Sequence, residues 1–287
     1  MKPVVMAFVA ATIWGLWWIP IRYLETLGLS GALGGMVMNV GAFLLCAVLV
    51  IILRVPLRME PRAWLGAALV GVAVTTYSTA LNYADVVRVI LLFYLAPAWS
   101  KIIEWAFMDQ RWTWVSTFAL AASFTGAVLI LGGQVGTSAL SIGDVLAVLS
   151  GMAWSAGSAL IFTCGRSSAM ALTLTSSLFA VLAGLPAIWV AELSLFHSAP
   201  LSANGLGMLF GAIYVVPIML LTLWSAQRLS PATLSFLLTA EILSGIISGA
   251  LFLDEPFGLI QALGAAMIIA AAISEVVPKL IGAQART

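Results

Sequence analysis

Charged residues are scarce in this sequence. Lysine and arginine number 12, aspartate and glutamate 11, and together they make up 8% of the 287 residues, whereas a soluble globular domain carries about 25%. With 63% hydrophobic residues and a mean hydropathy of +1.14, the composition excludes a soluble domain and predicts a protein with several helices in the lipid bilayer. The net charge of +1 also excludes a nucleic-acid partner, because phosphate binding needs a dense basic surface.

Cysteine and histidine are nearly absent too. Cys46 and Cys164 fall inside apolar runs, so we expect them to pack among neighbours without a disulfide. The sequence contains no metal-ligand cluster, phosphate loop or nucleotide motif, so we expect no metal and no cofactor, and ATP-driven transport would need a partner subunit. Residues 28–31 read GLSG and imitate an intramembrane serine protease motif, but Ser30 is placed as an N-cap and the one histidine, His197, falls in a short loop. We therefore predict that the protein is not an enzyme.

Apolar runs of about 20 residues, the length that crosses a bilayer, recur along the chain. The connections between them are short and leave no room for an extramembrane domain. The first run lacks a convincing signal-peptide cleavage site and is followed by many others, so it is interpreted as a helix. The sequence predicts an all-α polytopic membrane protein with ten transmembrane helices, over residues 4–21, 30–53, 63–82, 86–108, 113–132, 144–164, 170–190, 205–225, 231–252 and 257–277.

Lysine and arginine are distributed unequally between the two sides of this predicted bundle. Cytoplasmic loops collect these residues, so their positions orient the helices. If the N-terminus is cytoplasmic, the outer ends hold only Arg22 and Arg88. The inner segments then hold Lys2, Arg54, Arg58, Arg62, Arg111, Arg166, Arg228, Lys279 and Arg286. Nine against two predicts that both termini are cytoplasmic and that the number of spans is even.

Two short motifs occur twice in the chain. Residues 13–15 read IWG and residues 153–155 read AWS, while residues 107–110 read FMDQ and residues 252–255 read FLDE. The offsets of 140 and 145 residues bracket a unit of five helices. Because five is odd, the second copy enters the membrane upside down, which is the inverted-repeat plan of secondary transporters. We predict one five-helix repeat over 1–138 and a second, inverted one over 139–287.

The predicted helix 86–108 has features that a lipid-facing helix avoids. A charge near the bilayer midplane costs roughly 2.5–3.5 kcal/mol and is retained where it faces protein or water. Lys101 lies at such a depth, and Glu104, three residues on, can pair with it. Pro97 removes a backbone hydrogen bond at the centre of the helix. We expect this helix to face a cavity and to hinge at Pro97, with a second hinge at Pro217.

Glu241 falls near the middle of the predicted helix 231–252, with no basic residue within its own helix turn. Three interpretations are open. It binds the substrate or a coupling proton; it forms a buried bridge with Lys101; or it is protonated and donates to a backbone carbonyl. Even a buried bridge would mark the midplane site, because desolvated ion pairs are costly to keep.

Eleven tryptophans require sorting, because most membrane tryptophans anchor at the interface. Those near helix ends are interpreted as such anchors: Trp64, Trp112, Trp114, Trp189 and Trp224. Deeper aromatic residues are candidates for a cavity wall, with core packing as the alternative. Together with the two charged residues, the predicted substrate-binding cavity comprises Trp14, Trp17, Tyr77, Tyr94, Lys101, Trp154, Tyr214 and Glu241.

Several motifs are similar to those of one transporter family. They are Trp-Gly at 14–15, YLAP at 94–97 followed by Gln110, and LFLDEP at 251–256. In these motifs the chain resembles the EamA-type proteins of the drug/metabolite transporter superfamily over essentially its whole length. The resemblance implies ten helices in two inverted five-helix repeats. Gln110 and AWSA at 153–156 look most like the aromatic amino-acid exporter branch.

These observations predict a monomeric secondary transporter of the bacterial inner membrane that moves a small metabolite by alternating access. The favoured substrates are amino acids, aromatic or other neutral ones, and the favoured direction is export. A substrate carboxylate would meet Lys101 or the Arg88 region, and an ammonium would meet Glu241. The alternative substrate is a quaternary or other organic cation, held by Glu241 among tryptophans through cation–π contacts.

Overall fold

The computed structural model describes residues 2–29, 32–130, 141–190, 199–238, 240–252 and 258–284, and these residues contain helices and no strand. One of the helices, η1 (Gly211–Val215), is a π-helix. The α-helices are α1 (Lys2–Trp14), α2 (Trp18–Thr26), α3 (Ala32–Ile52), α4 (Pro61–Ala80), α5 (Val86–Phe93), α6 (Ala96–Phe107), α7 (Trp114–Ile130), α8 (Ile142–Thr163), α9 (Ala169–Val190), α10 (Leu201–Phe210), α11 (Val216–Ala226), α12 (Pro231–Leu238), α13 (Ala240–Phe252) and α14 (Leu259–Gln284).

Each of the ten predicted ranges falls on one of these helices or on consecutive ones, so the all-α class is confirmed. Within the described residues, six stretches are long and apolar enough to cross a membrane: Lys2–Thr26, Leu33–Ile52, Pro61–Ala80, Ile142–Thr163, Ala169–Pro186 and Leu201–Ala226. That α5–α6, α7, α12–α13 and α14 cross as well remains a prediction.

Three of the predicted helices are interrupted shortly before a proline. A proline lacks a backbone donor and clashes with the carbonyl four residues earlier. The positions outside regular α-helix are Leu16, four residues before Pro20, Tyr94, three residues before Pro97, and Ile213, four residues before Pro217. The structure divides the predicted helices 4–21 and 86–108 into two helices each, although Lys2–Thr26 as a whole remains one candidate membrane span.

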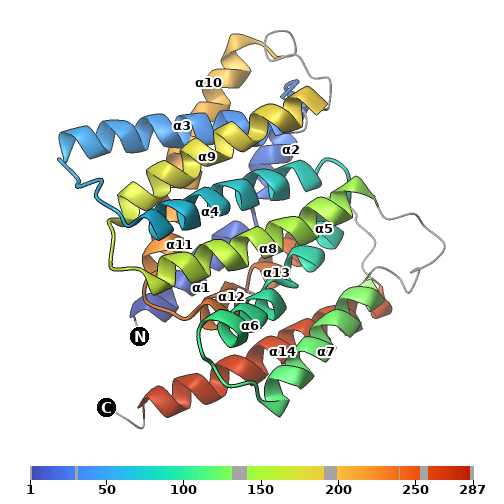
Figure 1. Ribbon diagram of the computed structural model, residues 1–287. Helices are drawn as coiled ribbons and strands as arrows, with labels where there is room; N and C mark the ends of the chain where they lie inside the picture. The colour runs from blue at the N-terminus through green and yellow to red at the C-terminus, as the bar shows by residue number, and fades with distance from the viewer. Residues whose placement is uncertain are drawn as a thin grey trace.

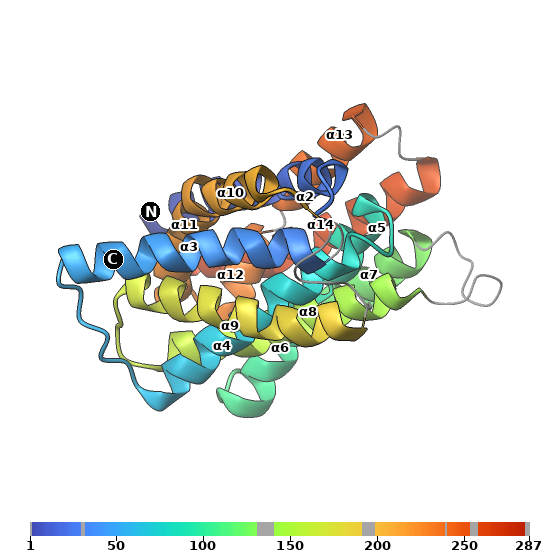
Figure 2. The same cartoon turned by 90° about the horizontal axis from the view of Figure 1, so that it is seen from above.

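The helices form a layered bundle. Figure 1 shows α3, α9, α4 and α8 side by side in that order, with α7 and α14 as a pair at the opposite edge. Both termini lie at the same end of the bundle in Figures 1 and 2. Helices α1, α5, α12 and α13 pack against one another or against α8, and α13 extends to the edge of the bundle in Figure 2.

The central helices α4 and α8 cross at a pair of glycines. A Cβ atom on Gly66 would lie 2.8 Å from the Gly157 carbonyl oxygen, and one on Gly157 would lie 2.7 Å from that of Gly66. Small residues let helix backbones approach closely in a membrane, where packing and not water drives association. This crossing brings Tyr77 of α4 and Trp154 of α8 into one interior region.

Candidate functional site

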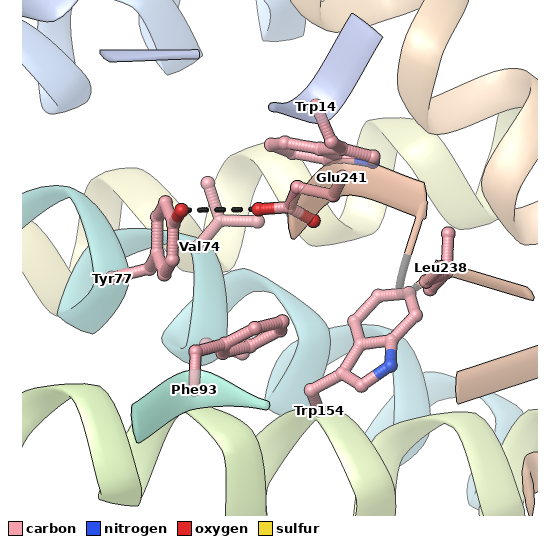
Figure 3. A pocket seen from close by; sticks show the side chains of 8 residues that line it. Trp14, Val74, Tyr77, Phe93, Trp154, Leu238 and Glu241 are labelled. Carbon is pink, nitrogen blue, oxygen red and sulfur yellow. Dashed lines mark hydrogen bonds between the residues drawn. The ribbon is translucent and has the colours of Figure 1, made fainter. Parts of the chain in front are cut away.

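A central cavity lies where helices from both halves of the chain meet. Four of its eight lining residues are aromatic and one is charged (Figure 3). Its volume of about 30 Å³ holds about two water molecules, since one needs roughly 10–15 Å³. The lining residues are Trp14, Ala73, Val74, Tyr77, Phe93, Trp154, Leu238 and Glu241. In this conformation the helices must separate before a metabolite can enter.

Glu241 is the acidic residue of the central cavity. It lies in the first turn of α13, and only 4% of its surface is exposed. The Tyr77 hydroxyl donates to Oε1 at 3.0 Å, as Figure 3 shows, and the Tyr94 hydroxyl lies 2.7 Å from Oε2. Each oxygen of the Glu241 carboxyl group is therefore hydrogen-bonded to a different tyrosine hydroxyl. The structure thus brings together three of the residues predicted to form the site.

Tyr94 also connects the two halves of the chain. It follows α5 directly, and its hydroxyl donates to the carbonyl of Leu238 in α12. The same hydroxyl contacts Glu241, so the end of α5 meets Leu238 and Glu241 at one point.

Aromatic rings form the walls of the central cavity. Tyr77 and Phe93 meet edge to face, with ring centroids 5.2 Å apart. The Trp14 indole N–H donates to Thr222 Oγ1 at 3.1 Å. The Trp154 indole N–H, by contrast, has no hydrogen-bond partner within the described part of the chain, although the residue is only 4% exposed. An unpaired buried donor costs about 1–3 kcal/mol, which an acceptor on a bound ligand would recover.

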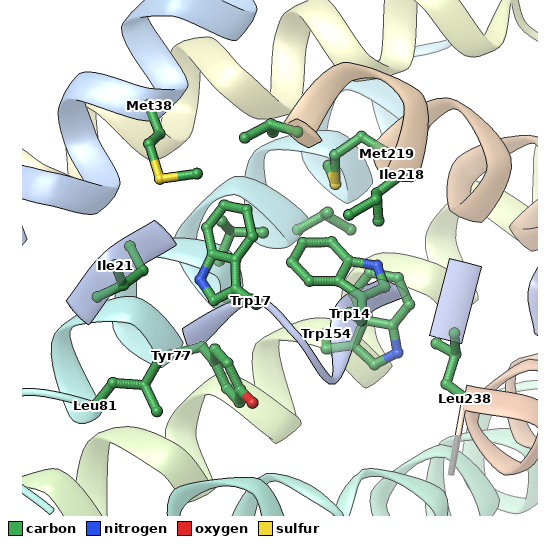
Figure 4. Packing of buried hydrophobic residues seen from close by; sticks show 14 of the residues in the cluster. Trp14, Trp17, Ile21, Met38, Tyr77, Leu81, Trp154, Ile218, Met219 and Leu238 are labelled. Atoms are coloured by element: carbon green, nitrogen blue, oxygen red, sulfur yellow. The ribbon is translucent and has the colours of Figure 1, made fainter. Parts of the chain in front are cut away.

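Trp17 and Tyr214 lie one layer behind the cavity. Trp17 is fully buried, packs on Trp14 with ring centroids 5.1 Å apart (Figure 4), and donates through its indole N–H to Ser78 Oγ at 3.1 Å. Tyr214 packs on Trp17 at 5.9 Å and donates to the Ile13 carbonyl. Neither lines the central cavity, so both support Trp14 instead of forming the wall.

Lys101 lies in a second, smaller cavity. Helix α6 places it with Pro97 beside Ser116 and Ser123 of α7 and Phe236 of α12. Among the described residues, the linings of the two cavities do not overlap. The structure therefore does not bring these two predicted site residues together.

Glu104 joins α6 to α12. Its Oε1 accepts a hydrogen bond from the Ala232 backbone N–H at 2.8 Å, in the first turn of α12. A carboxylate is favoured there because the helix dipole is positive at its N-terminus. One turn deeper, the hydroxyls of Ser100 and Ser235 share a hydrogen bond of 2.9 Å.

Comparison with known proteins identifies the family of this bundle. The description of the EamA-like transporter family matches residues 1–132 and again 141–274. The chain belongs to the EamA-like transporter family. One solved crystal structure of a protein resembles the fold with a TM-score of 0.69 and 17% sequence identity, over 96% of this chain and 98% of that one. None of the curated proteins compared with the chain matches it.

EamA-like proteins are membrane transporters of the drug/metabolite type and not enzymes, so the predicted family and its general function are confirmed. Ser30 and His197, on which the protease interpretation depended, lie outside the described residues. Within the described ranges, no group of three or more histidines, cysteines or acidic residues is placed to hold a metal ion.

The two prolines predicted as EamA hinges each open the second part of an interrupted helix. Pro97 lies at the start of α6 and Pro217 at the start of α11, next to the π-helix. Interrupted backbone absorbs dihedral changes more easily than a continuous helix, which suits a hinge. The hinge motion itself remains a prediction.

Sequence reasoning missed several wall residues of the EamA cavity, among them Val74, Phe93 and Leu238. An apolar residue in a membrane helix has the same appearance in the sequence whether it faces lipid, core or cavity. Phe93 had one available signal, its position directly before Tyr94 in the motif that carries the resemblance.

Proposed function

We propose that this EamA-family protein is a secondary transporter that binds a small metabolite with a protonated amine in the central cavity. The observation that supports it is the Glu241 carboxylate, buried among aromatic rings and held by Tyr77 and Tyr94. A substrate ammonium pairs with this carboxylate, and the faces of Trp14 and Trp154 stabilise its charge by cation–π attraction.

Amino acids, aromatic or other neutral ones, are the first candidate substrates. Their ammonium pairs with Glu241, and their side chain lies against the ring of Trp14 or Phe93. The carboxylate accepts from the Trp154 indole N–H, which has no partner among the residues that the structure describes. In this proposal Trp154 binds the substrate carboxylate. The sequence assigned that role to Lys101, which lies in the other cavity.

Quaternary or other organic cations are the second candidate. The residues that line the central cavity include a carboxylate but neither lysine nor arginine. A substrate carboxylate would therefore have one neutral donor and no counter-charge, whereas a monovalent cation leaves the site neutral. Charge balance favours this class, and the unpaired Trp154 donor favours the amino acids.

The transport cycle in this proposal is alternating access between two inverted five-helix repeats, over residues 1–138 and 139–287. The pairs α5–α6 and α12–α13, one from each half, meet at the central cavity. Toward the end that holds the termini, α6 lies against α12; toward the other end, α5 lies against α13. Substrate passes when one of these contacts opens and the other stays closed.

An ion pair reinforces the end of the bundle opposite the termini. Arg88 of α5 contacts Asp144 of α8 through Nε–Oδ1 at 2.5 Å and Nη2–Oδ2 at 2.6 Å. The Asp144 side chain is 3% exposed and also forms a capping box with Ser141. A paired, two-pronged contact of this kind is geometrically specific. We assign it to the outer closure of the transporter.

The proposal places the protein in the bacterial inner membrane as a monomer that exports its substrate, with both termini in the cytoplasm. The common end of the two termini supports an even number of crossings (Figure 1). The α3–α4 and α8–α9 connections lie at that same end and hold Arg54, Arg58 and Arg166. Basic loops of this kind face the cytoplasm.

Transport into proteoliposomes tests the proposal with three probes. Phenylalanine and phenethylamine share a ring and an ammonium, but phenethylamine lacks the carboxylate, and tetramethylammonium is a bare cation. Phenylalanine-selective transport supports the amino-acid class, and transport of the two amines supports the cation class. Glu241→Gln is expected to abolish transport of every active probe. The proposal fails if no probe enters faster than into protein-free vesicles.

A further inference from the structure

The hydrogen bonds around Glu241 require more hydrogens than the tyrosines possess. Three oxygen–oxygen contacts are made: Tyr77 Oη with Glu241 Oε1, Tyr94 Oη with Glu241 Oε2, and Tyr94 Oη with the Leu238 carbonyl. Each contact needs one hydrogen between its two oxygens. Two hydroxyl groups supply two hydrogens, and a backbone carbonyl supplies none.

Among the described groups that make these three contacts, the Glu241 carboxyl group is the source of the third hydrogen. If Oε2 carries it, Oε2–H donates to the Tyr94 oxygen, Tyr94 donates to the Leu238 carbonyl, and Tyr77 donates to Oε1. Every contact is then satisfied. If Glu241 were ionised, Tyr94 would have one hydrogen for two acceptors.

The charges around Glu241 lead to the same conclusion. The titratable groups that face it are Tyr77 from α4, Tyr94 after α5, and, further away, Tyr214 from η1. Helix α1 contributes Trp14, which is uncharged, and the lining residues contain no lysine or arginine. An ionised carboxylate at this depth would have no counter-charge, which is costly in a membrane interior.

We propose that Glu241 is protonated in the closed conformation and that the substrate ammonium replaces this proton, which makes the protein a proton–amine exchanger. This inference rests on the proposed function and adds its coupling ion. In the exchange the Glu241 O–H bond breaks, its proton passes to water, and the carboxylate pairs with the incoming ammonium. The Tyr94 hydroxyl hydrogen turns from Leu238 to Oε2, so the ion pair keeps a donor.

Ionisation on substrate binding is compatible with the position of Glu241. Once the Tyr94 hydrogen has turned to Oε2, each oxygen of the ionised carboxylate accepts from one hydroxyl, that of Tyr77 or that of Tyr94. Because the carboxyl group holds either a proton or an ammonium, each replaces the other on the side to which the cavity is open. Exchange of a proton for a monovalent cation is then electroneutral, whereas exchange for a zwitterionic amino acid moves one net charge per cycle.

Infrared spectroscopy tests the protonation without any ligand. The purified full-length protein at neutral pH is expected to show the C=O stretch of a protonated carboxylic acid that Glu241→Gln lacks. The amide of glutamine can donate to Tyr94 and accept from Tyr77, so this variant should keep the fold. Glu104→Gln, which changes a carboxyl outside the central cavity, is the control and should keep the band. Identical spectra for wild type and Glu241→Gln would overturn the inference.

Proton release tests the exchange itself. Phenethylamine is added to the protein in weakly buffered solution with a pH indicator, and one proton per bound amine is expected. Because proton and amine compete, the apparent Kd should rise by up to about tenfold per pH unit on acidification. Binding without proton release overturns the inference and leaves the proposed function standing. Absence of binding counts against the proposed function, and the infrared result still decides the protonation.

Discussion

The Glu104 carboxylate on α6 accepts a hydrogen bond from the Ala232 N–H on α12, at 2.8 Å. The two residues are 128 positions apart and belong to different halves of the chain. Glu104 is 1% exposed and Ala232 is fully buried. This contact closes the end of the central cavity that we assign to the cytoplasm, and it fixes the N-terminus of the helix that leads to Glu241.

Glu104→Ala is expected to lower the free energy of unfolding by about 1–3 kcal/mol, because it leaves a buried backbone donor without its acceptor. Glu104→Gln keeps an acceptor oxygen and should lose less. Glu25→Ala, which breaks the exposed pair with Arg22, is the control and should change it by less than about 1 kcal/mol. Equal losses for Glu104→Ala and Glu25→Ala, measured by denaturation in detergent, would contradict the role of the contact.

Trp154→Phe separates the two substrate classes. It keeps an aromatic wall but removes the unpaired indole N–H. If that group binds a substrate carboxylate, phenylalanine affinity should fall roughly 10- to 100-fold, as for a lost hydrogen bond to a charged group. Phenethylamine affinity should change little, and thermal stability shows whether the fold is intact. An equal loss for both ligands would mean that Trp154 acts as a wall alone.

Gly15→Ala should disrupt the contact between α1 and α13. An added Cβ would lie 2.0 Å from Ser244 Oγ and 2.5 Å from the Glu241 carbonyl oxygen, so the two backbones must separate beside the site. Overpacking of this kind destabilises by about 1–3 kcal/mol, and we expect transport to fall with it. Gly205→Ala is the matched control, because nothing lies within 4 Å of its added Cβ. Gly205 lies inside helix α10, so Gly205→Ala should stabilise the protein by about 0.5–1 kcal/mol.

Cys164 provides a test of both topology and pH dependence. Burial raises the pKa of its thiol, and the neighbouring Glu60 carboxylate raises it further. The thiolate is the reactive form, so at neutral pH labelling by a maleimide should be slow and should accelerate as pH rises. Glu60→Gln removes the charge but keeps an acceptor for the Gly165 N–H, and it should speed labelling at neutral pH.

The side from which Cys164 reacts reports the orientation. A membrane-impermeant reagent should label it in inverted vesicles and not in intact cells, because the α8–α9 connection is predicted to be cytoplasmic. Cys46 is fully buried and should not react, and Cys164→Ser serves as the control. Labelling of Cys164 in intact cells would reverse the proposed topology.

Most of the helices, and the family, followed from local features of the sequence. The lengths of apolar runs fixed where helices lie, because a backbone in lipid must satisfy its own hydrogen bonds. The site was predicted in part: Trp14, Tyr77, Trp154 and Glu241 line the central cavity and Tyr94 contacts Glu241. Trp17 and Tyr214 proved to lie behind the wall, and Lys101 in another cavity.

The sequence alone determined that the chain is helical and membrane-bound, and its motifs marked it as EamA-like, since composition and short motifs are properties of the chain itself. It also drew attention to Glu241 as a charge without a local partner. Only the tertiary structure decided which partner it has. Tyr77 is 164 positions away and Tyr94 147 positions away, and no sequence period relates residues on different helices. Which side chains face each other depends on how interrupted helices rotate and pack, and this set Glu241 between two tyrosines and apart from Lys101.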